Sequence, residues 1–195
     1  MLIGITGGIG SGKTALSNLL RAHGYLVYDS DKEARRLQNE HPEIRSKIIE
    51  LFGSEIYNAN GLNRCELAKH VFGNAVLLVK LNAIVHPVVM DDLVQWKCLN
   101  NTQKLLFVES AILFESGFDI VADKVLVVTA SKELRVKRIV KRDGCTPEHA
   151  LARMAAQISE EEKVMRANIV LSSDDNKLKE TDIPELILRI LELNK

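Results

Sequence analysis

A glycine-rich turn near the amino terminus has residue types suited to binding phosphate. The stretch GGIGSGKT at residues 7–14 matches the spacing G-x-x-x-x-G-K-[ST] and lies between a β-forming run and a helical pattern. Its glycines let the backbone curl around an anion with the N–H groups pointing inward. Lys13 adds positive charge for the outer phosphates, and the Thr14 hydroxyl is suited to hold Mg²⁺. The motif predicts nucleoside triphosphate binding, and the alternative is a glycine-rich turn without a ligand.

Acidic residues follow two predicted strands, at the sheet edge where open α/β folds bind ligands. The sequence DSD at 29–31 follows the second strand, and Glu109 follows the third. One of the two aspartates can be a helix N-cap. For Asp29 that role and a functional one both stay open, whereas we expect Asp31 to point into the cleft. Glu109 has the position at which phosphate-loop enzymes keep the acid that holds Mg²⁺.

Three arginines near the carboxyl-terminal end of the sheet form a basic stripe. Arg135, Arg138 and Arg142 are three and four residues apart, so they share one helix face. A glycine and a proline then break the chain before a second helix that extends to Gln157. Two such helices are typical of the lid that closes over phosphates in small kinases, and a solvated basic face is the alternative. We expect this lid at 135–159.

Apolar patterning predicts the elements that position these residues. Strands are expected at 2–5, 25–28, 104–108, 123–128 and 168–171, and helices at 14–23, 131–142, 147–157 and 184–193. With the phosphate-binding turn, this order predicts an α/β protein, a three-layer phosphate-loop NTPase fold with a five-stranded parallel sheet. The nucleotide-binding core is expected at 1–31 with 103–134 and 160–195.

Residues 32–102 form a predicted helical insertion. Residues 33–102 contain no convincing strand, and helices are expected from residue 31 and at 42–52, 64–72, 74–85 and 87–98, with a turn at 58–61. Pro87 at a first helical position predicts a break after His86. This helical segment is longer than a single crossover connection between two strands. We therefore expect a separate lobe, which in phosphate-loop kinases holds the second substrate.

Composition disfavours binding to nucleic acid or to anionic membrane, although local clusters could still bind a small polyanion. The 195 residues carry 26 Lys and Arg against 26 Asp and Glu, so there is no basic field for nucleic acid or anionic membrane. No apolar run approaches the roughly 20 residues that span a bilayer, and a signal-peptide layout is absent. Cys65, Cys98 and Cys145 are widely spaced, which indicates reduced thiols. We expect a cytoplasmic protein, monomeric or weakly homo-oligomeric.

The remaining motifs resemble one family, the dephospho-CoA kinases. The resemblance covers nearly the whole chain: GITGGIGSGKT, then DSD and EARRL, GLNRCELAKHVF, LNAIVHP, ILFESG, RVKRIVKRD, Gln157 and RANIVL. It implies transfer of the γ-phosphoryl group of ATP to the ribose 3′-hydroxyl of dephospho-CoA, the last step of coenzyme A synthesis. It also implies Mg²⁺, and it places the dephospho-CoA pocket in the helical lobe.

The resemblance further implies roles for individual residues. Catalysis is assigned to Asp31, Lys13 and Arg138. Contacts with ATP are assigned to Gly8, Ile9, Gly10, Ser11, Gly12, Lys13, Thr14, Ala15 and Arg142. Contacts with the acceptor are assigned to Asp31, Arg64, Asn82, His86, Glu115 and Gln157, and Mg²⁺ ligation to Thr14 and Glu109. For His86, bracing the lobe stays open beside binding the substrate.

Four positions depart from the family pattern. Glu109 and Ala111 replace the usual Asp and Pro after the third strand, which bears on the metal geometry. Asn168 and Ser173 replace an Asp and an Asn in the region that often neighbours adenine, which bears on base selectivity.

Three other functions share some of these features. A kinase for nucleoside monophosphates has the loop and lid but does not need LNAIVHP. A regulatory GTPase needs an N-K-x-D motif, which residues 176–179 leave incomplete. A nucleotide-dependent nucleic-acid binder is disfavoured by the zero net charge.

Overall fold

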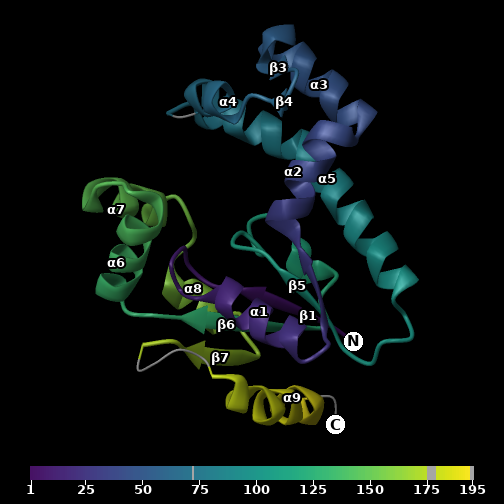
Figure 1. Cartoon of the computed structure of the whole chain (residues 1–195), viewed down its shortest axis with the longest axis vertical. Coiled ribbons are helices and arrows are strands. Elements are labelled where there is room, and N and C mark those ends of the chain that lie inside the picture. The colour runs from purple at the N-terminus through teal and green to yellow at the C-terminus, as the bar shows by residue number, and fades with distance from the viewer. Residues whose placement is uncertain (72, 175–178, 194–195) are drawn as a thin grey trace. The chain divides into compact units, whose positions relative to one another are not determined.

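The chain consists of two compact units. The computed structural model describes residues 1–71, 73–174 and 179–193. Its contacts separate a first unit, Met1–Asp29 with Asn100–Lys195, from a second unit, Ser30–Leu99. The predicted end of a helix at Phe72 and most of the incomplete N-K-x-D stretch lie outside the described residues. Figure 1 labels the elements along the chain.

The first unit is built on a parallel sheet of five strands. They are β1 (Leu2–Thr6), β2 (Leu26–Asp29), β5 (Leu106–Glu109), β6 (Lys124–Thr129) and β7 (Ile169–Ser172). Their order is β2-β5-β1-β6-β7, and every neighbouring pair is parallel (Figure 1). All residues of β1 and β5 are buried, as expected for central strands covered on both faces. The predicted five-stranded parallel sheet is confirmed.

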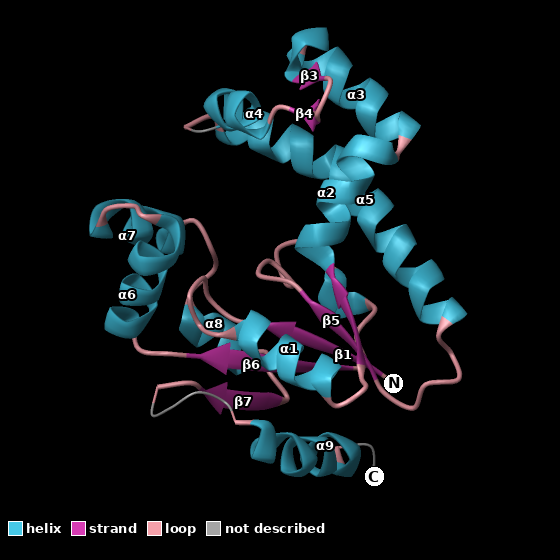
Figure 2. Cartoon of the chain, viewed as in Figure 1, coloured by secondary structure: helices cyan, strands magenta, loops and turns pink. Residues whose placement is uncertain are grey.

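Helices cover this sheet. The first unit contains α1 (Lys13–Ala22), α6 (Lys132–Asp143), α7 (Pro147–Ala155), α8 (Glu160–Met165), α9 (Ile183–Glu192) and the short turns η2 (Phe118–Ile120) and η3 (Glu180–Asp182). Leucines of α1 and four apolar residues of α9 pack with Ile3, Ile5 and Phe107 into one core on one face of the sheet. Figure 2 shows the helices in cyan and the strands in magenta. On the other face, Leu113 fills the space beside Gly4. The sheet is therefore the middle layer.

Helix α8 was not among the elements expected from the sequence. Its signal is local: the Ser159 side chain accepts a hydrogen bond from the N–H of Glu162, and three glutamates occupy the first turn. Acidic residues at a helix start are favoured by the helix dipole, and S-x-x-E is a capping pattern. Because this helix has only six residues, the periodic spacing of its apolar residues was too weak to predict it.

The second unit is mostly helical. It contains α2 (Ser30–Glu40), α3 (Pro42–Phe52), η1 (Ser54–Ile56), β3 (Tyr57–Asn58), β4 (Gly61–Leu62), α4 (Arg64–Val71) and α5 (Ala75–Leu99). The turn expected at 58–61 joins β3 and β4 into an antiparallel hairpin. The expectation that residues 33–102 contain no strand was therefore wrong by these two short strands. Each strand has two residues, too few for an alternating pattern to be recognised.

The predicted break after His86 was wrong, because α5 continues through Pro87. Its buried residues Leu81, Val85, Val89 and Leu93 keep a spacing of four across the proline, so one apolar stripe runs the length of the helix. A proline removes the hydrogen bond to the carbonyl four residues earlier, here that of Ala83. Both Ala83 and Pro87 are exposed, so water can reach that carbonyl and the cost is lowered.

Across the described ranges, none of the helices has both the length and the apolar content needed to cross a bilayer.

Candidate active site

The loop between β1 and α1 has the backbone shape of an anion site. Gly7, Gly10 and Gly12 have φ of 148°, 82° and 103°, in the left-handed region that favours glycine. Gly12 is the N-cap of α1 and has no side chain with which to cap the helix. The first N–H groups of a helix lack acceptors within it and attract negative charge. This end of α1 can therefore hold a phosphate.

The glycines are also required by the protein itself. A Cβ on Gly7 would lie 2.1 Å from the carbonyl oxygen of Val128, and one on Gly8 would lie 1.9 Å from Nη2 of Arg135. On Gly10 it would lie 2.8 Å from the carbonyl oxygen of Arg135. Real Cβ atoms do not approach other atoms so closely. The loop is therefore packed against β6 and α6 as well as shaped for a ligand.

Lys13 begins α1 and turns back over the loop. Its side chain is 8% exposed, and Nζ donates to the carbonyl oxygens of Gly7 at 2.9 Å and Gly8 at 3.1 Å. The ammonium group is thus held at the same turn whose N–H groups suit an anion. Because its stem is flexible, the charge can move from these carbonyls to a phosphate.

The side chains of Thr14 and Glu109 are hydrogen-bonded to each other beside the phosphate loop. Thr14 Oγ1 donates to Glu109 Oε1 at 2.7 Å, and the Glu109 side chain is buried, with 7% exposed. The other oxygen, Oε2, is buried and has no hydrogen-bond partner among the described residues. A buried carboxylate oxygen without a partner is costly, so this atom is suited to a cation or a metal-bound water.

These residues fit Mg²⁺. Within the part of the chain that is described, no three His, Cys, Asp or Glu side chains gather into a complete metal site. Mg²⁺ is typically held by only one or two protein oxygens and takes its remaining ligands from substrate phosphates and water. Thr14 and Glu109 beside a phosphate loop agree with that pattern.

Arg135 lies against the back of the phosphate loop, and it was not among the predicted site residues. It is 7% exposed, its Nε donates to the carbonyl oxygen of Ile9 at 3.0 Å, and its Nη1 pairs with Glu160. Burial lowers the pKa of this guanidinium, but it stays charged. Helical spacing placed Arg135 in the basic stripe and gave no signal that it is the buried member.

Arg138 and Ser173 continue this contact with the loop. Arg138 Nη1 donates to the carbonyl oxygen of Gly10 at 3.1 Å and to Ser173 Oγ at 2.8 Å, and Nη2 donates to the Ser173 carbonyl at 3.0 Å. Ser173 Oγ in turn donates to the carbonyl oxygen of Ser11 at 2.7 Å. The serine that departs from the family pattern is thus part of the loop's support.

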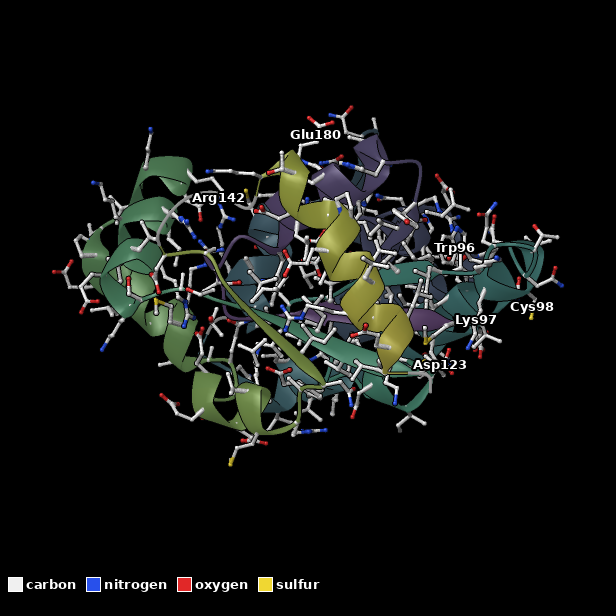
Figure 3. The ribbon with its side chains drawn as sticks, turned by 90° about the horizontal axis from the view of Figure 1, so that it is seen from below. Trp96, Lys97, Cys98, Asp123, Arg142 and Glu180 are labelled. Carbon is white, nitrogen blue, oxygen red and sulfur yellow. The ribbon has the colours of Figure 1, made fainter. Side chains whose placement is uncertain are left out.

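Arg142, the third arginine of the stripe, is exposed near the end of α6 (Figure 3). It donates from Nε to Asp143 at 2.6 Å, and Arg153 of α7 pairs with the same carboxylate. The hydrogen bond and charge of Asp143 raise the pKa of Arg142. The two basic helices of the expected lid are therefore joined through Asp143.

Gln157 connects two loops. Its Oε1 accepts from the N–H of Ile9 at 2.8 Å, and its Nε2 donates to the carbonyl oxygen of Ala111 at 3.0 Å. Lys163 donates to the same carbonyl at 3.0 Å. The side chain expected to contact the acceptor thus holds the phosphate loop to the segment that follows Glu109.

Glu115 lies on the exposed edge of that segment. Its Oε1 accepts from the N–H of Ile158 at 3.2 Å and lies 3.5 Å from Nζ of Lys163, whose side chain is 0% exposed. Burial lowers the pKa of Lys163, and the charge of Glu115 opposes that shift. Contact of Glu115 and Gln157 with a substrate stays a prediction.

The other predicted residues belong to the second unit. Asp31 is the second residue of α2, so it lies inside the helix and is not its N-cap. Its side chain is exposed. Arg64 begins α4, is exposed, and donates to Gln38 Oε1 at 3.1 Å. Asn82 and His86 are four residues apart on α5, which puts them on one face, and both are half-buried. Burial lowers the pKa of His86.

Comparison with known proteins gives a consistent result. A sequence model of the dephospho-CoA kinase family, CoaE, matches residues 1–180. A dephospho-CoA kinase of Bacteroides fragilis is 40% identical over 191 residues, covering 98% of this chain and 90% of that protein. A solved structure of a Thermus thermophilus protein is 36% identical with a TM-score of 0.82, over 100% of this chain and 98% of that one. A dephospho-CoA kinase structure from Campylobacter jejuni is 27% identical with a TM-score of 0.71, over the same shares.

Proposed function

Because the chain belongs to the dephospho-CoA kinase family, we propose a role for each polar residue of the site in the phosphorylation of dephospho-CoA, the last step of coenzyme A synthesis. The enzyme uses ATP as the phosphoryl donor. In this proposal the γ-phosphoryl group passes to the ribose 3′-hydroxyl of the acceptor, and CoA and ADP are released. The observation that carries the proposal is a phosphate loop whose Thr14 contacts a buried carboxylate, Glu109, at 2.7 Å.

The loop is proposed to bind the phosphates of ATP. Within residues 8–15, backbone N–H groups at the start of α1 lie where the helix dipole favours negative charge, while those of Ile9 and Ser11 already donate to Gln157 and Gly8. Lys13 exchanges its contacts with Gly7 and Gly8 for the outer phosphates. In phosphoryl transfer most of the rate comes from positioning and charge stabilisation, which is what such a loop supplies.

Thr14 and Glu109 are proposed to hold Mg²⁺, either directly or through water. When bound, Mg²⁺ neutralises phosphate charge and orients the transferred group. The unpartnered Oε2 of Glu109 supports this assignment, as does the Thr14 hydroxyl beside its other oxygen. The glutamate keeps the charge and oxygen chemistry of the usual aspartate, with one more methylene of reach.

Asp31 is proposed to orient the acceptor hydroxyl and to take its proton late in the transfer. A free aspartate has a pKa of about 3.9, far below that of a sugar hydroxyl, so early proton removal is unfavourable. Arg64, Asn82 and His86 are proposed to bind dephospho-CoA, and contacts with this acceptor are also proposed for Glu115 and Gln157. The exposed state of Asp31 and Arg64 supports a site open to a large acceptor.

Arg138 and Arg142 are proposed to stabilise charge on the transferred group. Arg142 is exposed and Arg138 lies at the phosphate loop, bonded to Gly10. Arg138 reaches a phosphate by giving up its Ser173 contacts.

The exposed, unbridged thiols of Cys65 and Cys98 support a reducing compartment, so we place the enzyme in the cytoplasm.

The proposal is tested by incubating the purified chain with MgATP and one of three acceptors: dephospho-CoA, CoA or a nucleoside monophosphate. We expect the mass of dephospho-CoA to increase by one phosphoryl group, giving a product that co-elutes with CoA. CoA should not react, because its 3′ position is already phosphorylated. Phosphorylation of CoA, or a faster reaction with the monophosphate, would contradict the assigned acceptor.

A further inference from the structure

Side chains from α6 and from the residue that follows β7 bind the back of the phosphate loop. Three consecutive carbonyl oxygens, those of Ile9, Gly10 and Ser11, accept hydrogen bonds from side chains. The donors are Arg135 at 3.0 Å, Arg138 at 3.1 Å and Ser173 at 2.7 Å, respectively. The loop therefore does not depend on its glycines alone for its shape.

These bonds also determine where the loop's N–H groups point. In a trans peptide the C=O of one residue and the N–H of the next point in opposite directions. With the Ile9 carbonyl turned toward Arg135, the N–H of Gly10 points away from α6. The Ser11 carbonyl, turned toward Ser173, has the same effect on the N–H of Gly12. Flexible glycines would otherwise let these peptide units rotate.

Arg135 differs from Arg138, the other arginine among these donors, in being buried rather than half-buried. It is 7% exposed, and its Nη2 occupies the space where Gly8 has no Cβ. Its partner Glu160 also accepts from the N–H of Ala130 at 3.3 Å, which links the pair to the end of β6. Charge-assisted hydrogen bonds of this kind are shorter and stronger than neutral ones.

We propose that Arg135 is a positioning residue for ATP: it holds the Ile9 carbonyl outward and so directs the N–H of Gly10 toward the phosphates without touching the nucleotide. This inference rests on the proposed function of residues 8–15 as the ATP site. Preorganised donors avoid reorganisation when the anion binds. The loss should therefore appear in affinity for ATP, and affinity for dephospho-CoA should not change.

The first experiment separates positioning from simple charge pairing. Arg135→Gln leaves Glu160 half-buried without its cation, which can destabilise the fold. The double variant R135Q/E160Q removes that unpaired charge. For both we measure thermal unfolding, KM for each substrate and kcat, with Arg189→Gln, an exposed arginine on α9, as the matched control.

We expect R135Q/E160Q to unfold near the wild-type temperature and to have a KM for ATP about 10- to 100-fold higher, the usual cost of losing a hydrogen bond to a charged group. KM for dephospho-CoA and kcat at saturating ATP should stay within about twofold, as expected when only uniform binding is lost. If the double variant regains wild-type affinity for ATP, Arg135 serves only to neutralise Glu160 and the proposal is wrong.

A second measurement uses Gly8, whose φ is outside the left-handed region, so alanine meets no backbone strain there. In the wild type, Gly8→Ala should displace Arg135 and weaken ATP binding. In the R135Q/E160Q background the same change should cost much less, because the obstructing guanidinium is gone. Equal costs in both backgrounds would overturn the inference. If the wild-type chain itself fails to bind ATP, it is the proposed function that fails.

Discussion

Around the phosphate loop three charged side chains are buried, whereas two charged side chains proposed for the acceptor are exposed to water. Lys13, Glu109 and Arg135 are each less than 10% exposed. Asp31 and Arg64, which we propose act on the acceptor in the same reaction, are exposed. Folding therefore includes the desolvation cost of these donor-site charges in the stability of the native state. The acceptor site keeps its charges solvated until dephospho-CoA arrives.

The ion pairs within each unit show the same contrast in exposure to water. In the second unit, Arg36 pairs with Glu33 and Glu40 of α2 and with Asp92 of α5, but its side chain is 41% exposed. Such solvated pairs contribute about 1 kcal/mol or less each. In the first unit, the Arg135–Glu160 pair is mostly buried, so removing either partner alone is expected to cost more.

The largest effects are expected for substitutions of Lys13 and Asp31, one residue from each region. Lys13→Met should lower kcat/KM by about 10³-fold or more, because a charge at the transferred phosphates is removed. Asp31→Asn should lower kcat by about 10²- to 10³-fold, within the usual contribution of a general base. Steady-state kinetics at saturating MgATP measures both. Lys137→Met, on the exposed side of α6, is the matched control for the lysine.

A greater loss from Asp31→Asn than from Lys13→Met, with binding of both substrates intact, would reverse this comparison. The buried donor site would then supply less of the rate than the solvated acid.

An intermediate effect is expected at Glu109. Glu109→Gln removes the charge beside Thr14 but keeps an oxygen that can accept its hydrogen bond. We expect activity to fall about 10- to 100-fold and the Mg²⁺ concentration for half-maximal activity to rise. Stability should stay equal or increase by up to about 1 kcal/mol, because a buried, partly unpartnered carboxylate is replaced by a neutral group. Chemical denaturation measures this, and a clear loss of stability would mean that the carboxylate is a structural residue.

The smallest effect is a pH dependence in the second unit. Burial lowers the pKa of His86 below its unfolded value of about 6.5. Between these two values the unfolded chain binds more protons, so the free energy of unfolding decreases as the pH falls through that window, by at most about 1.4 kcal/mol per unit. His86→Gln should remove this part of the slope. His149→Gln, at an exposed position on α7, is the matched control.

The same His86 variant tells the two open roles of this residue apart. If His86 braces the helices, the KM for dephospho-CoA at pH 8 should match that of the wild type. If it binds the acceptor, that KM should rise although the fold is intact.

Local patterns were sufficient for most of the first unit. The phosphate loop, the five strands and the position of Glu109 at a strand end each depend on a few neighbouring residues, and all were found from sequence. The roles of Asp31, Arg64 and Asn82 came from a family resemblance and stay predictions. Glu109 is found in contact with Thr14, a pairing across 95 positions that no local pattern contains.

What could not be predicted depends on tertiary contacts. Spacing put Arg135 and Arg142 on one face, but only the packing of α6 against the loop makes the first buried and leaves the second in water. Pro87 looked like a helix start because its local preference is strong. The apolar stripe of α5 outweighed that preference, and the lost hydrogen bond faces solvent.

The alignment of the strands shows how an apolar residue can determine the position of a carboxylate. In the sheet, Ile5 and Asp29 are both level with Glu109, and Phe107, whose side chain is 0% exposed, is level with Ile3. Sliding β5 by one residue would carry Phe107 out of the core and turn Glu109 to the opposite side. The fit of one phenyl ring among its neighbours thus fixes the height and the side at which the acid emerges. Mutations that loosen this ring should misplace the acid before they unfold the chain.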